Sequence, residues 1–182
     1  TDGVFGKSRR FSGTSINVGN VSPLSSLEYN SNMTFSAWIK TGTDQSGTII
    51  SKQESSGNYR GYNLQTGFGG YIYFQLVNTY SSNTLEVRST SNLNYYDNQW
   101  HLITATYDGS ATAAGVKLYF DGLEVATTTT INTLSATITN ASSFHIGSRN
   151  GAAQFFNGLI DEVRVFNSVL DSETIKDQYV SG

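Results

Sequence analysis

Tyrosine, arginine and asparagine recur in short segments between the predicted strands or at their ends. These residue types suit a sugar, because an aromatic ring covers the C–H face of a pyranose while guanidinium and amide groups bind its hydroxyls. We therefore predict a sugar-binding site formed by Tyr59, Arg60, Tyr62, Tyr71, Tyr73, Arg149 and Asn150. Taken singly, most of these residues also fit the alternative that Tyr-rich loops merely pack over the edge of the fold.

The acidic residues do not form a pattern that predicts hydrolysis. Glycosidases use two carboxylates that face one bond, whereas the glutamates of this chain are scattered singly. Asp161 and Glu162 are adjacent, so on a regular strand their side chains would point to opposite faces. The sequence also has no cysteine nucleophile, P-loop, GxSxG or HExxH motif. We predict that the domain is not an enzyme.

Composition argues against several classes of partner. A net charge of −3 opposes nucleic acid, whose phosphates need a clustered basic surface. No apolar run approaches the ~20 residues of a membrane-spanning helix. A charged fraction of 14% and many Gly, Ser, Thr, Asn and Tyr residues are typical of secreted or cell-surface binding domains. Because the first residue is Thr1, we expect a piece of a larger protein, tethered in nature to other domains.

These residues lie on or beside short predicted strands, and the pattern of the strands is that of a β-sandwich. From Met33 to Lys40 and from Gly70 to Asn78, residues alternate between two faces. In the second run Tyr71, Tyr73 and Gln75 oppose an apolar set. This alternation predicts that the apolar set lies in the core and that the tyrosines lie on an open surface.

Two local signals are more specific. Asp121-Gly122 separates Val116–Phe120 from Leu123–Thr127, and this dipeptide tolerates the positive φ values of a type I′ turn, so we predict a hairpin. Near the C-terminus, Asp171 can cap a short helix from Ser172 to Gln178. The sequence shows no linker or internal repeat, and residues 1–182 are predicted to form a single domain.

The order of motifs resembles a laminin G-like domain of the concanavalin A-like lectin/glucanase superfamily. This resemblance covers nearly the whole chain and implies an all-β, two-sheet antiparallel jelly roll with one concave sheet. The segments that carry it are Phe11-Ser12-Gly13, Met33 to Lys40, Gln99-Trp100-His101-Leu102, Tyr107-Asp108-Gly109, Leu118 to Gly122, Phe144 to Gly147 and Phe156 to Phe166.

The resemblance also implies a structural calcium ion. In related jelly rolls the aspartate of the last segment binds calcium together with backbone carbonyls, a role that suits a hard cation. We therefore expect Asp161 to be a calcium ligand, assisted by the carbonyls near Gly13. The alternative is an aspartate satisfied by loop amides. Trp38, Trp100 and the two histidines, His101 and His145, are interpreted as structural.

The leading functional prediction is a carbohydrate-binding, lectin-like module that recognises glycan or polysaccharide chains. A second hypothesis is an adhesion or structural domain of a surface protein, with a protein partner and no sugar site. A fragment of a glycosidase or lyase is a third, weaker one. A titration with soluble polysaccharides separates the first two.

Overall fold

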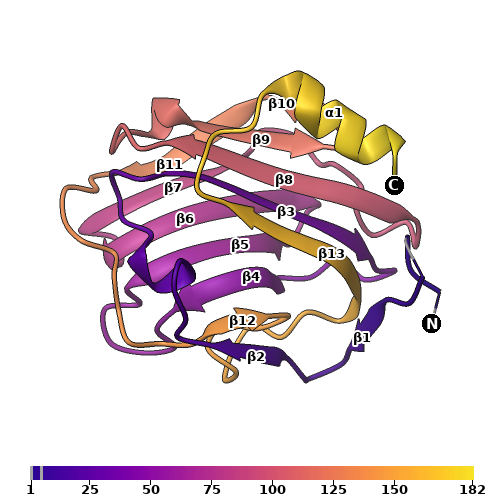
Figure 1. The fold of residues 1–182 in the computed structure, drawn as a ribbon, viewed down its shortest axis with the longest axis horizontal. Helices are drawn as coiled ribbons and strands as arrows, with labels where there is room; N and C mark the ends of the chain where they lie inside the picture. Colours follow the sequence, from indigo (N-terminus) through magenta and orange to yellow (C-terminus); the bar gives the residue numbers. More distant parts are fainter. Residues whose placement is uncertain (1, 5) are drawn as a thin grey trace.

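Two antiparallel sheets face each other in the computed structural model, which describes residues 2–4 and 6–182 (Figure 1). In spatial order, the six-stranded sheet contains β1 (Arg9–Phe11), β13 (Gly158–Phe166), β3 (Asn32–Lys40), β8 (Trp100–Asp108), β9 (Val116–Phe120) and β10 (Leu123–Val125). The seven-stranded sheet contains β11 (Thr127–Asn132), β7 (Asn83–Ser89), β6 (Tyr71–Thr79), β5 (Gly61–Gly67), β4 (Thr48–Gln53), β12 (Phe144–Ile146) and β2 (Ile16–Gly19). The predicted all-β jelly roll is confirmed.

The core lies between the sheets and follows the predicted alternation. Phe35, Ala37 and Ile39 of β3 point into it and are at most 1% exposed. Phe35 packs against Phe74 of the opposite sheet, with ring centroids 5.7 Å apart. Full burial of each such large side chain contributes about 1.5–3 kcal/mol to folding. The two inner faces therefore hold the sheets together.

The predicted hairpin joins β9 to β10. Asp121 and Gly122 have φ values of 51° and 78°, as a type I′ turn requires, and Leu123 pairs with Phe120. The second predicted strand is, however, divided. β10 ends at Val125, and β11 starts at Thr127 and pairs with β7 of the other sheet. The chain crosses between sheets at this point, which a continuous β-prone sequence does not reveal.

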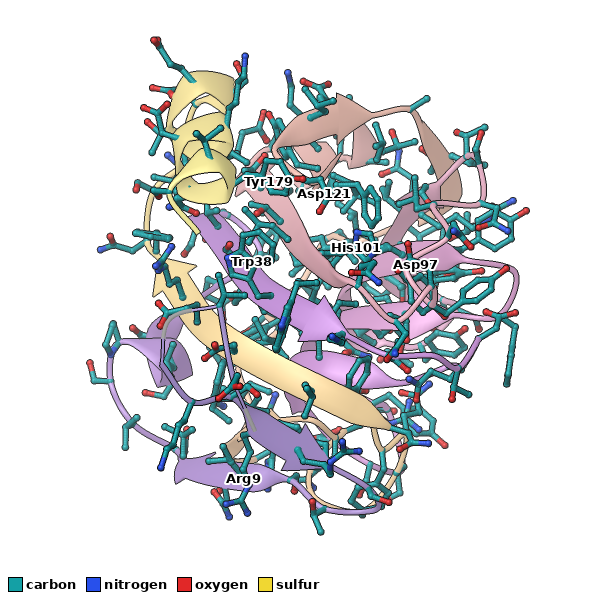
Figure 2. All side chains as sticks on the ribbon, turned by 90° about the vertical axis from the view of Figure 1, so that its right-hand side faces the viewer. Arg9, Trp38, Asp97, His101, Asp121 and Tyr179 are labelled. Carbon is teal, nitrogen blue, oxygen red and sulfur yellow. The ribbon has the colours of Figure 1, made fainter. Side chains whose placement is uncertain are left out.

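The helix α1 (Ser172–Val180) covers part of the outer face of the six-stranded sheet (Figure 1). Asp171 caps it by accepting a 2.7 Å hydrogen bond from the backbone N–H of Thr174, as predicted. Tyr179 stacks on Trp38 of β3, with centroids 5.5 Å apart (Figure 2). Trp38 is therefore buried beneath the helix. No helix among the described residues has both the length and the apolar character of a membrane-spanning segment.

A β-bulge interrupts β13 where strict alternation was expected. The register with β3 shifts between Asp161 and Arg164, and Glu162 has a φ of +46°. A bulge of this kind re-aims side chains. Glu162 accepts a 2.8 Å ion-paired hydrogen bond from Arg164, so the two half-buried side chains satisfy each other at the bulge.

Candidate functional site

The outer face of the seven-stranded sheet is polar but recessed. A row of paired residues crosses it from β7 to β12: Glu86, Gln75, Asn63, Ser51 and His145. These side chains point away from the core, yet each is at most 7% exposed. On a flat, open sheet they would be largely exposed. The surrounding loops therefore rise above this face and form a concave surface.

A hollow of about 280 Å³ lies on this face. It is close to the lower limit of ~300 Å³ for small-molecule pockets, a size suited to one or two sugar residues. Its lining consists of amide side chains, two tyrosines and one arginine: Gln53, Tyr59, Gln65, Gln75, Tyr80, Arg149 and Gln154. We call this the Arg149 hollow. None of its lining residues is acidic.

Three loops provide the walls of the Arg149 hollow. Tyr59 lies in the β4–β5 loop and Tyr80 in the β6–β7 turn, and the N–H of Tyr80 joins them by donating to the Asn58 carbonyl at 3.0 Å. Arg149 and Gln154 lie in the β12–β13 loop. That loop is anchored to the sheet because the N–H of Thr48 donates to the Gln154 carbonyl at 2.8 Å. The walls are thus held by main-chain bonds.

Strained backbone accompanies these loops. Tyr59, Asn150 and Gln154 have φ values of 54°, 53° and 47°, in the left-handed region that residues other than glycine seldom adopt. Each such residue costs on the order of 1 kcal/mol, and such strain often gathers at ligand-binding positions. The hollow is therefore a preformed feature whose shape the fold maintains at some cost.

The amides on this face are only partly used by the protein. Asn63 Nδ2 donates to Gln65 Oε1 at 2.8 Å and to Gln53 Oε1 at 3.4 Å. Gln75 donates to the carboxylate of Glu86. The amide nitrogens of Gln53 and Gln65 then have no bond to any described residue. These groups are available to the hydroxyls of a ligand.

An arginine stacked on a tyrosine gives the hollow its charge. The guanidinium carbon of Arg149 lies 4.8 Å from the ring centre of Tyr59, and the Tyr59 and Tyr80 rings meet edge to face at 6.1 Å. Burial lowers the pKa of Arg149. The nearby negative charge of Glu86 and, second, burial raise the pKa of Tyr80. Tyr80 is 46% exposed, so its ring is open to a ligand.

The predicted sugar-binding residues have different positions. Tyr59 and Arg149 line the hollow. Arg60 and Asn150 follow them in the chain without lining it: Arg60 Nε donates to the Asn78 carbonyl at 3.4 Å, and Asn150 Nδ2 donates to Ser55 Oγ at 3.5 Å. Tyr71 lies further along the outer face, where the Arg88 guanidinium is 4.2 Å from its ring centre.

Tyr73 shares that outer face and pairs with Gln65, but its ring packs against Gly67 and does not line the hollow. The prediction for Tyr62 is wrong. Tyr62 is 2% exposed and belongs to the core, where its hydroxyl donates to the Leu24 carbonyl at 3.1 Å. Burial raises its pKa. Tyr62 alternates with Asn63 along β5, so it faces the core when Asn63 faces outward.

Sequence reasoning missed Gln53, Gln65 and Tyr80. Alternation along β4 and β5 places both glutamines on the outer face, but their convergence depends on the strand register. Tyr80 follows β6 directly and reaches the hollow because the β6–β7 turn contacts the β4–β5 loop. The sequence offered one signal for Gln53 and Gln65: each is a polar residue on the strand face opposite the apolar residues.

The expected calcium site does not fit the fold around Gly13. In the β1–β13 ladder Arg9 pairs with Ile160, beside Asp161, and Phe11 pairs with Gly158. Gly13 thus follows the end of β1 that lies away from Asp161. Asp161 accepts hydrogen bonds from the backbone N–H groups of Val4 at 2.8 Å and Glu162 at 3.0 Å. Its contacts favour the alternative of an aspartate satisfied by amides, and chelation tests between the two.

A second charged group lies at the other sheet, and we call His101, Asp97 and Asp121 the His101 cluster (Figure 2). His101 Nδ1 is 2.8 Å from Asp121 Oδ2, and its Nε2 is 3.0 Å from Asp97 Oδ1. Asp121 Oδ1 also accepts the N–H of Leu102 at 2.9 Å. Two carboxylates can each accept a hydrogen bond from the ring only when both ring nitrogens of His101 carry protons. The cluster ties the β9–β10 turn to the loop before β8.

The pKa values of the His101 cluster shift accordingly. Burial by itself lowers the pKa of His101, but hydrogen bonds with Asp121 and Asp97 outweigh it, and the pKa is raised above 6.5. The hydrogen bond from His101 lowers the pKa of Asp97. Among the described residues no group of three or more His, Cys, Asp or Glu side chains could hold a metal ion. The cluster is an ion network formed by the protein's own side chains.

The fold and the recessed face define a lectin-like β-sandwich. Residues 12–176 match the family model described as the concanavalin A-like lectin/glucanases superfamily. The chain belongs to this family, in its laminin G-like branch. Among curated proteins, the adhesion G-protein coupled receptor V1 of Danio rerio is 29% identical over 182 residues. That match covers 97% of this chain but 3% of the receptor, so the chain spans a small part of this relative.

Solved structures share the fold at low sequence identity. The CBM40 module of Ruminococcus gnavus IT-sialidase, bound to α2,3-sialyllactose, has a TM-score of 0.71 and 19% identity and covers 97% of both chains. Domain 4 of an extracellular GH43 arabinanase from Geobacillus stearothermophilus, in complex with arabinotriose, has a TM-score of 0.66 and 20% identity, over 97% of this chain and 78% of that one. The binding domain of paraclostridial mosquitocidal protein 1 has a TM-score of 0.70 and 18% identity, over 98% and 44%.

Proposed function

We propose that this domain is a carbohydrate-binding module that holds a glycan in the Arg149 hollow. The observation that carries the proposal is the combination of uncommitted amide groups with an exposed aromatic ring in one preformed recess. Gln53 and Gln65 offer donors for sugar hydroxyls, and Tyr80 offers a ring for the C–H face of a pyranose. The sialyllactose and arabinotriose complexes of two similar folds support a sugar as ligand.

The proposed role is binding without catalysis. Most glycoside hydrolases use two carboxyl groups that flank the scissile bond, and the lining of the hollow contains none. Glu86 is the acidic residue nearest in the polar row, and it is engaged by Gln75 and by Thr130 Oγ1, which donates to Glu86 Oε1 at 2.6 Å. We further propose that the domain belongs to a larger secreted or cell-surface protein and holds it near polysaccharide.

The test is a glycan array followed by titration of the best ligand against wild type and Tyr80→Ala. We expect the substitution to weaken binding by about 1–3 kcal/mol, the scale of one lost contact at a binding site, with an unchanged melting temperature. The matched control is Phe68→Ala, which removes another aromatic residue, 69% exposed and outside the hollow. Equal losses in both variants, or the absence of any bound glycan, would contradict the proposal.

An adhesion domain with a protein partner is the second candidate. It is favoured by the adhesion receptor among the relatives and by a toxin binding domain of similar fold that was solved in complex with rat synaptotagmin II. In this case no glycan binds. The same array therefore separates the two candidates.

A further inference from the structure

Arg149 differs from the other half-buried arginines of the domain, Arg60, Arg88 and Arg164, in having no acceptor. Arg164 pairs with Glu162 at 2.8 Å, and Arg88 Nη1 donates to the Ser89 carbonyl at 3.0 Å. The guanidinium of Arg149 forms no hydrogen bond or ion pair with any described residue, and its Nε is buried without a partner. Its one side-chain contact of note is the face of Tyr59.

Such an arrangement is unfavourable in the free protein. Removing a cation from water is costly unless a counter-charge or hydrogen-bond acceptors replace the lost hydration. Stacking on a tyrosine ring recovers only a part of this cost. The fold nevertheless holds Arg149 in place, because its backbone N–H donates to the Ala153 carbonyl at 2.9 Å within an anchored loop.

The nearby carboxylate does not neutralise this charge. Glu86 is 7% exposed, and its oxygens accept hydrogen bonds from Gln75 and Thr130. No ion pair joins Glu86 to Arg149 among the described residues. The other lining residues are neutral amides and tyrosines. A ligand that enters the hollow therefore meets one positive charge with free N–H groups and no competing acid in the lining.

We propose that the hollow selects a carboxylate-bearing sugar residue, whose carboxylate is bound by the guanidinium of Arg149 while its hydroxyls contact the glutamine amides. This inference rests on the proposed function and narrows its ligand to acidic glycans. Charge-assisted bonds between guanidinium and carboxylate are about twice as strong as neutral ones. Since the net charge of −3 repels a polyanion at long range, selectivity arises at contact.

The experiment compares matched acidic and neutral ligands by calorimetric titration of the whole domain. The pairs are oligogalacturonate with its carboxyl-reduced product, and sialyllactose with lactose. We expect an acidic member to bind at least about ten-fold more tightly than its neutral counterpart, the factor that corresponds to one charged hydrogen bond. Dextran sulfate serves as a control for unspecific binding of polyanions.

Two variants assign the selectivity to Arg149. Arg149→Gln should abolish the preference for the acidic member and keep residual binding to the neutral one. Arg149→Lys should retain part of the preference, because it keeps the charge but loses the planar fork. A neutral member that binds as tightly as the acidic one, an Arg149→Gln variant with its preference intact, or equal binding of dextran sulfate would each overturn the inference and leave the proposed glycan-binding function standing. Failure of every sugar to bind would overturn both.

Discussion

The His101 cluster and the Arg149 hollow are both built around a basic side chain, but their partners differ. Both ring nitrogens of His101 have a carboxylate within 3.0 Å, whereas Arg149 has no acceptor among the described residues. In the first region the protein satisfies its own polar groups, and the result is a link between two loops. In the second, polar groups remain free in a recess. Polar groups that have partners within the protein stabilise the fold, whereas polar groups without partners in a recess are available to a ligand.

Lys52 shows that a basic group can be satisfied without a carboxylate. It is 2% exposed, and its Nζ donates to the carbonyl and the side-chain oxygen of Asn140 at 2.6 and 3.3 Å. Burial lowers its pKa. Lys52 faces the core side of β4, opposite Tyr62 of β5. Burial of a basic side chain therefore does not mark a site by itself. Arg149 differs from Lys52 because its buried Nε has no partner and it lines a hollow.

The largest effect is expected from opening the His101 cluster. Asp121→Ala removes the acceptor of the His101 ring and of the Leu102 N–H and places alanine at a φ of 51°. We predict a loss of about 2–4 kcal/mol in the free energy of unfolding, measured by urea denaturation. Asp121→Asn is the control, since it tolerates the left-handed backbone and keeps one oxygen acceptor. An equal loss in both variants would show that neither the retained acceptor nor the backbone conformation accounts for the effect.

A smaller effect should follow from pH. The folded pKa of His101 is raised above its unfolded value of 6.5, so its contribution to stability is fully present below pH 6.5 and is lost as the pH rises through the folded pKa. We predict that the free energy of unfolding falls as the pH rises from 6.5 through the folded pKa of His101. His101→Gln should flatten the curve there. A wild-type curve that rises or stays level across this pH range would contradict the charged cluster.

Removal of the basic side chain from the Arg149 hollow should hardly affect the free energy of unfolding. Arg149→Ala removes a partly desolvated cation without an acceptor, and the lost contact with Tyr59 offsets that relief. We predict a free energy of unfolding within about 0.5 kcal/mol of wild type, as for surface substitutions. Thermal and urea denaturation both measure it. A loss as large as that of Asp121→Ala would mean that Arg149 serves the fold and would remove the contrast between the regions.

Chelation should have the smallest effect. Asp161 already accepts two backbone N–H groups, so we predict that EDTA leaves the melting temperature unchanged. An ion bound only by the native state would stabilise it, and chelation would then lower that temperature. A decrease that calcium reverses would instead support the calcium role inferred from the family resemblance.

The sequence predicted the fold better than the site, for physical reasons. Alternation in β3 and the Asp121-Gly122 turn depend on local chemistry, and both are confirmed. The site depends on register and loop contacts between distant segments. Tyr59 and Arg149 were predicted, but they meet only because the β4–β5 and β12–β13 loops converge over the same face. Gln65 carried no signal beyond its place opposite an apolar set. Tyr62 was misassigned because the alternation along β5, which turns its side chain toward the core, was not applied to it.

We propose that the Arg149 hollow, and not the His101 cluster, contacts the ligand. The most direct measurement is a titration of isotope-labelled domain with its best glycan from the array, followed by amide chemical shifts in NMR spectra. We predict that the resonances of Gln53, Gln65, Gln75, Tyr80 and Arg149 shift with saturation, while those of Asp97, His101 and Asp121 stay in place. Shifts confined to the His101 side, or spread evenly over both sheets, would contradict the account.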